Sequence, residues 1–261
     1  MGLQSNINSK LGESQDMVFD VNGVSFKMVN VEGGSFWMGA QNDDPKERNY
    51  DKVAWDNESP VHHVTLDSFL LGETVVTQAL RRAVMGEEPL FTRTWKDELG
   101  KGDEYPAYGV DWYDLNQFIK RLNEITGKCF RLPTEAEWEF AARGGVKSRG
   151  FRFAGSDDLD AVGWYEDNSG AKSHPVKGKK PNELGLYDMS GNMWEWCNDW
   201  YGQYSAEPQI NPAGPPKRWF WVLRGGSWLN EADACRTANR HRYIEGVDHN
   251  ILCFRLALSN V

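Results

Sequence analysis

The stretch that organises this chain reads PNELGLYDMSGNMWEWCNDW and covers residues 181–200. Glycines, aromatic residues and acids alternate in it too densely for an ordinary helix or strand. The three tryptophans of its second half predict large, rigid burial: Trp194, Trp196 and Trp200. Asp188 and Glu195 would then be carboxylates held among aromatic rings, and a buried carboxylate needs hydrogen-bonding partners, a cation or protonation. Spacing alone leaves open the alternative that both acids cap turns or accept backbone N–H groups.

The composition indicates a globular protein with aromatic anchors set in much irregular backbone. The 261 residues are 40% apolar and 26% charged with both signs mixed, and they include 12 tryptophans and 26 glycines. With 29 basic and 38 acidic side chains the formal net charge is −9, so we do not expect binding to nucleic acid. No stretch approaches the roughly 20 apolar residues that span a bilayer. Residues 1–17 contain no apolar signal core, which predicts either a cytosolic protein or a processed mature form.

Cysteine and histidine spacing gives no metal-binding motif. The four cysteines lie far apart in sequence without a CxxC pair, which disfavours zinc: Cys129, Cys197, Cys235 and Cys253. We predict that they are buried free thiols rather than a disulfide framework. His62 and His63 are adjacent, and on a strand they would point to opposite faces, so they could not chelate one metal together.

Residues 1–86 predict a β-rich start followed by a helix. Residues 1–16 are polar and predict a flexible tail. Residues 17–39 alternate apolar and polar side chains around Asn22-Gly23, which is a strong hairpin signal. Residues 40–60 predict a long surface loop that leads into one strand over 61–71.

Three helices are predicted from their capping residues. The first occupies residues 77–86, between a threonine N-cap and a terminal glycine, and the second occupies residues 111–127. The second is the clearest, because its apolar positions recur at helical spacing: Leu115, Phe118, Ile119, Leu122 and Ile125. The third begins at Thr134, which forms a capping box with Glu137, and ends by residue 145. Helices first and glycine-rich short strands later indicate a single α+β domain over residues 17–261.

Six ordered motifs resemble the formylglycine-generating-enzyme, or sulfatase-modifying-factor, family. They are GGSFWMG (33–39), ESPVHHVTL (58–66), RLPTEAEWEFAARGG (131–145), NELGLYDMSGNMWEWCNDWY (182–201), RGGSW (224–228) and CFRLAL (253–258). The resemblance spans roughly residues 24–258. It implies a much-elaborated C-type-lectin fold with little regular secondary structure.

The resemblance also implies a structural calcium ion, held largely by backbone carbonyls around the GNxWEW segment. When the family's calcium ligands are carried over position by position, the ligands in this sequence would be Asp188, Gly191, Met193 and Glu195. Carboxylate and carbonyl oxygens suit a hard cation. A second calcium site of the family lies near residues 161–170, where this sequence departs from the pattern, so we do not carry that ion over.

The catalytic machinery that the resemblance implies is missing from the sequence. The family's oxidases bind copper through two cysteines between the GGSW-like motif and the R-x-A-x-R stretch, and two thiolates suit Cu(I). Here Ala232 stands where the nearer cysteine belongs, residues 229–231 replace the other, and Cys235 is out of register. The iron-dependent branch needs a separate helical domain and an H-x-x-x-H spacing, which this chain lacks. We therefore predict a non-enzymatic protein, with a copper-dependent oxidase acting on a protein cysteine as the alternative.

The C-terminal region has the composition of a binding surface, although an ordinary polar loop is the simpler interpretation. Trp219, Phe220 and Trp221 cannot all be buried on one side of a strand, so at least one should face solvent. Aromatic and polar side chains on loops over a rigid scaffold are typical of binding paratopes. We expect these three residues to be hydrophobic anchors. The residues expected to add shape and polar contacts are Leu229, Asn230, Asp233, His241, Tyr243, Asp248 and His249.

Four arginines near the C terminus are expected to be structural. They would pair with acids or carbonyl groups beneath the loops, because the guanidinium fork suits buried carboxylates: Arg224, Arg236, Arg240 and Arg255. Two stretches, 235–240 and 254–257, also match fixed landmarks in one branch of the family. In that branch a diversity-generating retroelement mutagenises the C-terminal region of a surface lipoprotein.

That further resemblance implies a variable ligand-binding region over residues 217–253, bounded by these landmarks. It implies a cell-surface location, an unknown protein or cell-surface ligand as partner, and a lipid anchor outside this sequence. Cys253 replaces the usual glycine of the branch. A regulatory module that docks another protein domain through the same face is a further alternative.

Overall fold

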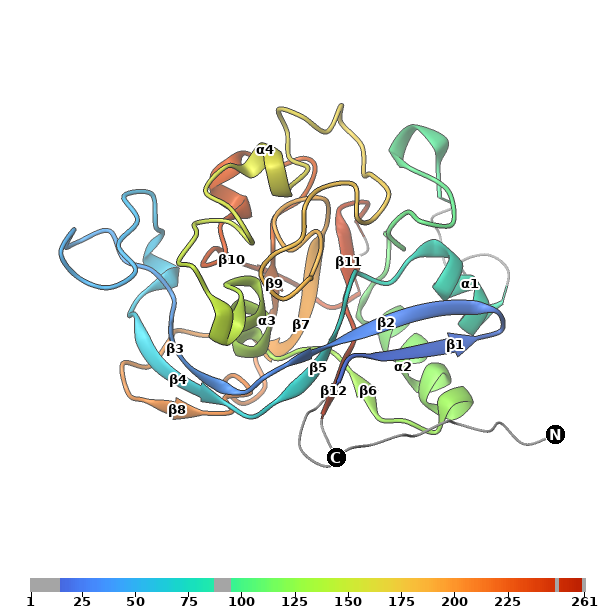
Figure 1. Cartoon of the computed structure of the whole chain (residues 1–261), viewed down its shortest axis with the longest axis horizontal. Helices are drawn as coiled ribbons and strands as arrows, with labels where there is room; N and C mark the ends of the chain where they lie inside the picture. The colour runs from blue at the N-terminus through green and yellow to red at the C-terminus, as the bar shows by residue number, and fades with distance from the viewer. Residues whose placement is uncertain (1–14, 87–94, 247–248, 260–261) are drawn as a thin grey trace.

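The computed structural model describes residues 15–86, 95–246 and 249–259. It is 20% helical and 25% strand, so more than half of the chain is irregular, as predicted for this α+β fold. The described strands form three sheets, with helices packed beside and between them (Figure 1). No helix in these ranges is long and apolar enough to cross a membrane.

The first sheet joins the two ends of the chain. Its order is β1 (Met17–Val21), β2 (Val24–Val31), β5 (Phe69–Gly72), β12 (Ala257–Ser259) and β6 (Phe130–Arg131). β1 and β2 form the predicted hairpin, with Val21 opposite Val24 across Asn22-Gly23. Asp16, which was predicted to belong to the flexible tail, is held by the sheet: its carboxylate accepts a hydrogen bond from Asn30 N (2.9 Å) and pairs with Lys27 (2.8 Å). Residues 1–14 lie outside the described ranges.

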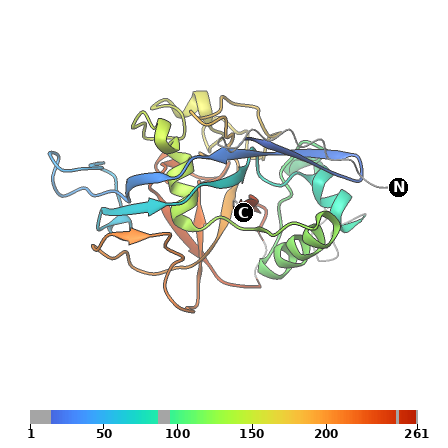
Figure 2. The ribbon, with the colours of Figure 1, turned by 60° about the horizontal axis from the view of Figure 1, so that its bottom comes forward.

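Two helices pack beside this sheet, and both begin where the capping residues predict. α1 (Gln78–Met85) follows Thr77, whose side chain accepts from Leu80 N, and α2 (Trp112–Thr126) follows Asp111, which accepts from Asp114 N. In Figure 2, α1 lies next to the β1–β2 hairpin, whereas α2 packs against α1 and β6. α2 buries Leu115, Phe118 and Leu122, whereas Ile125, near its end, is exposed.

The second sheet is built around the stretch quoted first. Its order is β10 (Arg240–Tyr243), β9 (Trp221–Arg224), β7 (Trp194–Trp200) and β11 (Leu252–Phe254). The third sheet has the order β3 (Gly34–Met38), β4 (His62–Leu66) and β8 (Gln209–Ile210). α3 (Glu135–Ala142) begins at the predicted capping box and contacts strands of both sheets. Every residue of α3 is buried, which explains why this helix shows no polar face.

The predicted strand over residues 61–71 is instead two strands. β4 pairs with β3 and β8, whereas β5 pairs with β2 and β12, so the chain changes sheets between Leu66 and Phe69. A Cβ atom at Gly33 would lie 2.6 Å from the Leu66 carbonyl oxygen, so only glycine allows this close crossing. His62 is buried and His63 half-buried on β4, in agreement with opposite faces.

Short helices complete the described structure, four of them of the 3-10 type: η1 (Asp56–Glu58), η2 (Asp97–Leu99), η3 (Gly145–Lys147), α4 (Leu159–Val162) and η4 (Ala232–Cys235). Two apolar cores flank the first sheet. One face contributes Met28, Leu70 and Leu258 to the core that contains α1 and α2, and the other contributes Val29, Leu71 and Ala257 to the core that contains α3. The period-two alternation along the strands divides these residues between the cores.

Candidate functional site

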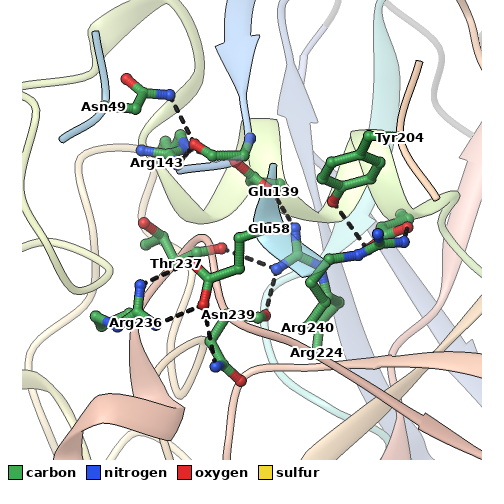
Figure 3. Close-up of polar contacts among 12 residues, drawn as sticks. Asn49, Glu58, Glu139, Arg143, Tyr204, Arg224, Arg236, Thr237, Asn239 and Arg240 are labelled. Carbon is green, nitrogen blue, oxygen red and sulfur yellow. Dashed lines mark hydrogen bonds and ion pairs between the residues drawn. The ribbon is translucent and has the colours of Figure 1, made fainter. Parts of the chain in front are cut away.

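The four C-terminal arginines are buried and paired with carboxylates, as predicted. Arg236 Nη2 and Nη1 lie 2.5 and 2.8 Å from the two Glu58 oxygens, and Arg255 binds both Glu195 oxygens at 2.7 and 2.9 Å. The other two arginines bind acids of α3: Arg240 contacts both oxygens of Glu135 at 2.7 Å, and Arg224 pairs with Glu139. Figure 3 shows five side chains of this set converging from distant segments: Glu58, Glu139, Arg224, Arg236 and Arg240. They form a rigid frame under the predicted binding surface.

Glu139 shows the electrostatics of this frame. Its side chain is fully buried, and burial alone would raise its pKa. The neighbouring Arg143 and Arg224 guanidinium groups outweigh burial and lower the pKa, so the carboxylate stays ionised. The frame is therefore a set of compensated charges whose role is structural.

Trp221 differs from the expectation of an exposed anchor. It is 8% exposed and stacks on Trp112 (3.4 Å between ring centres) and on Trp200 (3.8 Å). Its ring therefore lies between a residue of α2 and a residue of β7, because both partners cannot occupy the same face of one ring. Trp221 is a support for the surface, and a ligand could not reach it without displacing its neighbours.

Trp219 and Phe220 take the other two positions of the aromatic run. Trp219 is 86% exposed, the largest exposed fraction among the exposed apolar side chains of the described residues. Phe220 is half-buried, and its ring centre lies 4.9 Å from the Arg242 guanidinium carbon. The prediction that at least one of the three aromatic residues faces solvent is confirmed by Trp219.

The β10 strand presents two further predicted residues. His241 is exposed, and its ring lies 5.3 Å from that of Trp194. Tyr243 is half-buried, lies opposite Trp221 in the β9–β10 register, and its ring is 6.4 Å from that of Trp196. The structure thus brings His241 and Tyr243 to the same strand pair as Trp221.

The remaining predicted contacts are more dispersed. Leu229 is 48% exposed, but Asn230 Oδ1 accepts hydrogen bonds from Trp194 Nε1 (2.9 Å) and from Ser227 Oγ (2.6 Å), so it holds the scaffold together. Asp233 accepts from Arg152 Nη2 at 2.9 Å, away from β10. His249 is half-buried, and Asp248 lies outside the described residues.

Sequence reasoning missed a cavity of about 700 Å³ beside β10. Its walls are Asp56, Asn57, Ser59 and Pro60, the segment 201–204, and the three consecutive strand residues 240–242. Arg242, Tyr201 and Asn57 were not predicted to contribute to a site. The alternation along β10 was the available signal, because Arg240 and Arg242 must point to one face of the strand.

The predicted calcium ligands are only partly free to bind an ion. Asp188 is buried; its Oδ2 accepts from Lys177 N at 3.0 Å, and its Oδ1 has no hydrogen-bonding partner among the described residues. Both Glu195 oxygens are engaged by Arg255, and Oε2 also accepts from Trp138 Nε1 at 2.9 Å. The cation that Glu195 needs is thus an arginine of the same chain. Gly191 and Met193 are both buried beside Asn192 in the turn before β7.

The cysteines are free thiols in separate surroundings. Cys253, Cys197 and Cys235 are fully buried, each in a different apolar cluster, as predicted for buried thiols. Cys129 is exposed instead, because it follows the C-terminal turn of α2 at the surface. Burial raises the pKa of Cys235 to about 12, so this thiol is not a ready metal ligand or nucleophile.

The chain has the C-type-lectin-like fold of formylglycine-generating enzymes. The features of this fold seen here are three small sheets, extensive irregular backbone and a C-terminal strand pair over a buried frame. The model of the sulfatase-modifying factor enzyme 1-like domain matches residues 18–260. The chain belongs to this family.

Solved and curated relatives share this domain. Treponema denticola variable protein 1 superposes with a TM-score of 0.81 at 32% identity, over 95% of this chain and 100% of that one. The formylglycine-generating enzyme of Streptomyces coelicolor is 32% identical over 82% of this chain and 81% of its own length. The serine/threonine-protein kinase pkn1 of Chlamydia pneumoniae is 34% identical over 88% of this chain, which spans 38% of that kinase.

Proposed function

We propose that this chain is a non-enzymatic ligand-binding protein whose C-terminal segments form the binding site. The observation that carries the proposal is Trp219, a large aromatic side chain left 86% exposed beside a strand pair that rests on a buried frame. Exposed aromatic residues on a rigid scaffold dominate binding energy, because little side-chain entropy is lost. The likeness to a variable protein in fold and sequence supports this function.

We further propose that residues 217–253 are the diversified region of a cell-surface protein. The fixed landmarks at 235–240 and 254–257 are its supports: Cys235, Arg236 and Arg255 are all fully buried. Exposed positions of the region, such as Trp219, Leu229 and His241, can vary without disturbing these buried contacts. The ligand would be a protein or another cell-surface molecule.

A peptide library tests the proposed binding surface. A random nine-residue phage library is selected on the immobilised protein, and the enriched peptides are then measured against Trp219→Ala. We expect at least about a tenfold loss of affinity, since a central aromatic anchor contributes about 2 kcal/mol or more. Ile210→Ala is the matched control, because Ile210 is 77% exposed on β8 in another sheet. Equal binding by both variants would place the site elsewhere.

The copper-dependent oxidase is the alternative, favoured by the similarity to formylglycine-generating enzymes. The separate clusters of Cys197, Cys235 and Cys253 support the non-enzymatic proposal, because a two-thiolate site needs neighbouring sulfurs. A Cu(I) titration in competition with a chromogenic chelator distinguishes the two. Stoichiometric binding that is lost in Cys235→Ser would favour the oxidase.

The structural calcium ion also remains part of the proposal. The unpartnered Asp188 Oδ1 fits a hard cation, since a buried carboxylate oxygen without a donor is otherwise costly. Asp188 with backbone carbonyls of Gly191 and Met193 would hold the ion, and Glu195 would remain with Arg255. The ion would neutralise the carboxylate and fix the turn before β7. A chelator should then lower the melting temperature of the wild type but not that of Asp188→Asn.

A further inference from the structure

The cavity beside β10 contains a guanidinium group that no acid of the described residues neutralises. Arg242 is exposed and has no hydrogen bond or ion pair with any described residue, in contrast to Arg224, Arg236, Arg240 and Arg255. Its guanidinium carbon lies 5.1 Å from the ring centre of Tyr201 and 4.9 Å from that of Phe220. Cation–π contacts with two rings hold the group in place, while no described residue accepts from its N–H donors.

The two rings are themselves fixed. Tyr201 N donates to the Phe220 carbonyl at 2.7 Å, which joins the two ring-bearing segments. The Tyr201 hydroxyl accepts from Asn57 Nδ2 at 2.9 Å, and Arg240 lies over the same ring at 4.7 Å. Arg242 is therefore presented by a preorganised aromatic support, which lowers the entropy cost of binding.

The charge around this cavity favours an acidic ligand. Lys217 and Arg218 are exposed just before Phe220 and have no ion pair among the described residues. Arg240 is neutralised by Glu135, and Asp56 is the acid on the described cavity wall. On the cavity wall itself the charge of Asp56 balances that of Arg242, so the excess positive charge comes from Lys217 and Arg218, three and two residues before Phe220. On a chain with a net charge of −9 this local excess points to an anionic partner.

The backbone beside Arg242 favours an extended chain as that ligand. β10 is the edge strand of its sheet and pairs only with β9 among the described residues. Asn57 Nδ2 covers the edge at the Arg240 carbonyl (3.3 Å), and the cavity continues along His241 and Arg242. An open edge offers backbone donors and acceptors to an added strand, and side-chain pockets then read every second residue.

We propose that this cavity binds an extended acidic peptide segment of a partner protein, with a carboxylate on Arg242. The inference rests on the proposed ligand-binding function and specifies its ligand. The planar guanidinium donates two parallel hydrogen bonds to a carboxylate. Lysine at this position would keep the charge but lose that geometry.

Matched peptides test the proposal. The probes are fluorescein-labelled nine-residue peptides from the selection above, each paired with a version in which Asp and Glu become Asn and Gln. The wild type should bind the acidic member at least about tenfold more tightly, the size expected of a charge-assisted bidentate contact. Arg242→Gln should abolish this preference, and Arg242→Lys should retain only part of it. Arg121→Gln is the control, because Arg121 is an exposed arginine of α2 outside the cavity.

The outcomes separate the two proposals. Peptides that need Trp219 but bind equally in acidic and amide form would overturn the acidic-peptide inference and leave ligand binding intact. Equal losses in Arg242→Gln and Arg121→Gln would overturn it too, as a general charge effect. If free glutamate displaces the labelled peptide completely, the cavity binds small anions and the proposal of a peptide ligand is rejected. Failure to select any Trp219-dependent peptide would count against both proposals.

Discussion

Glu58→Gln is the sharpest perturbation of the buried frame. Glu58 is 0% exposed, and its side chain receives two hydrogen bonds from Arg236, 178 residues away in sequence. The amide has nearly the same shape as the carboxylate, so packing is preserved. Its NH₂ group, however, would face the guanidinium donors, and Arg236 would keep only Asp51 at 3.7 Å as a nearby acid.

The expected loss of stability is large for an isosteric change. Removing one partner of a buried ion pair costs about 3 to 5 kcal/mol, because the remaining charge stays buried without compensation. For a chain of this size that corresponds to a fall in melting temperature of roughly 6 to 20 °C. Glu124→Gln is the matched control, since the Arg121–Glu124 pair is 58% and 50% exposed. Exposed pairs contribute about 0 to 1 kcal/mol.

Urea unfolding followed by tryptophan fluorescence measures both variants, with near-ultraviolet circular dichroism to check that each native state is intact. Equal midpoints for Glu58→Gln and Glu124→Gln would refute the reasoning, since burial would then not decide the value of the pair. A changed slope of the unfolding free energy against urea would show that the mutation alters the folded or unfolded state itself.

Trp221→Ala should lower the free energy of unfolding by about 3 to 5 kcal/mol, because it leaves a cavity between Trp112 and Trp200. Trp219→Ala should change the same free energy by less than about 0.5 kcal/mol, because the side chain is exposed. Urea titrations measure the free energy of unfolding of both variants. Burial and repulsion from Glu135 raise the pKa of Asp199 to about 8, so the protonated acid stabilises the fold fully below pH 3.8 and this contribution is lost as the pH rises towards 8. Asp199→Asn should remove this loss of stability with rising pH, which is roughly 4 kcal/mol at most between pH 4 and 7. If the unfolding free energies of the variant and the wild type differ by a constant amount over this range, the raised pKa of Asp199 is contradicted.

Local chemistry explains which parts of the fold could be predicted. Thr77, Asp111 and Thr134 accept hydrogen bonds from residues three positions on, so these helix starts depend on neighbours in sequence. The Asn22-Gly23 hairpin is equally local. The division of residues 61–71 into β4 and β5 could not be predicted, because each strand is defined by its partners in a different sheet.

The sequence determined the residue types of the site: buried arginines that need acids, an aromatic run that must expose a ring, and tryptophans around residues 194–200. Only the tertiary structure decided which partner each one meets. Glu58 reaches Arg236 across 178 residues, and Glu135 reaches Arg240 across 105. Trp219 and Trp221 differ only in what packs against them, which is why one is exposed and the other buried. Folding placed Arg242 beside two aromatic rings and beside no acid of the described residues, and this combination depends on segments far apart in the chain.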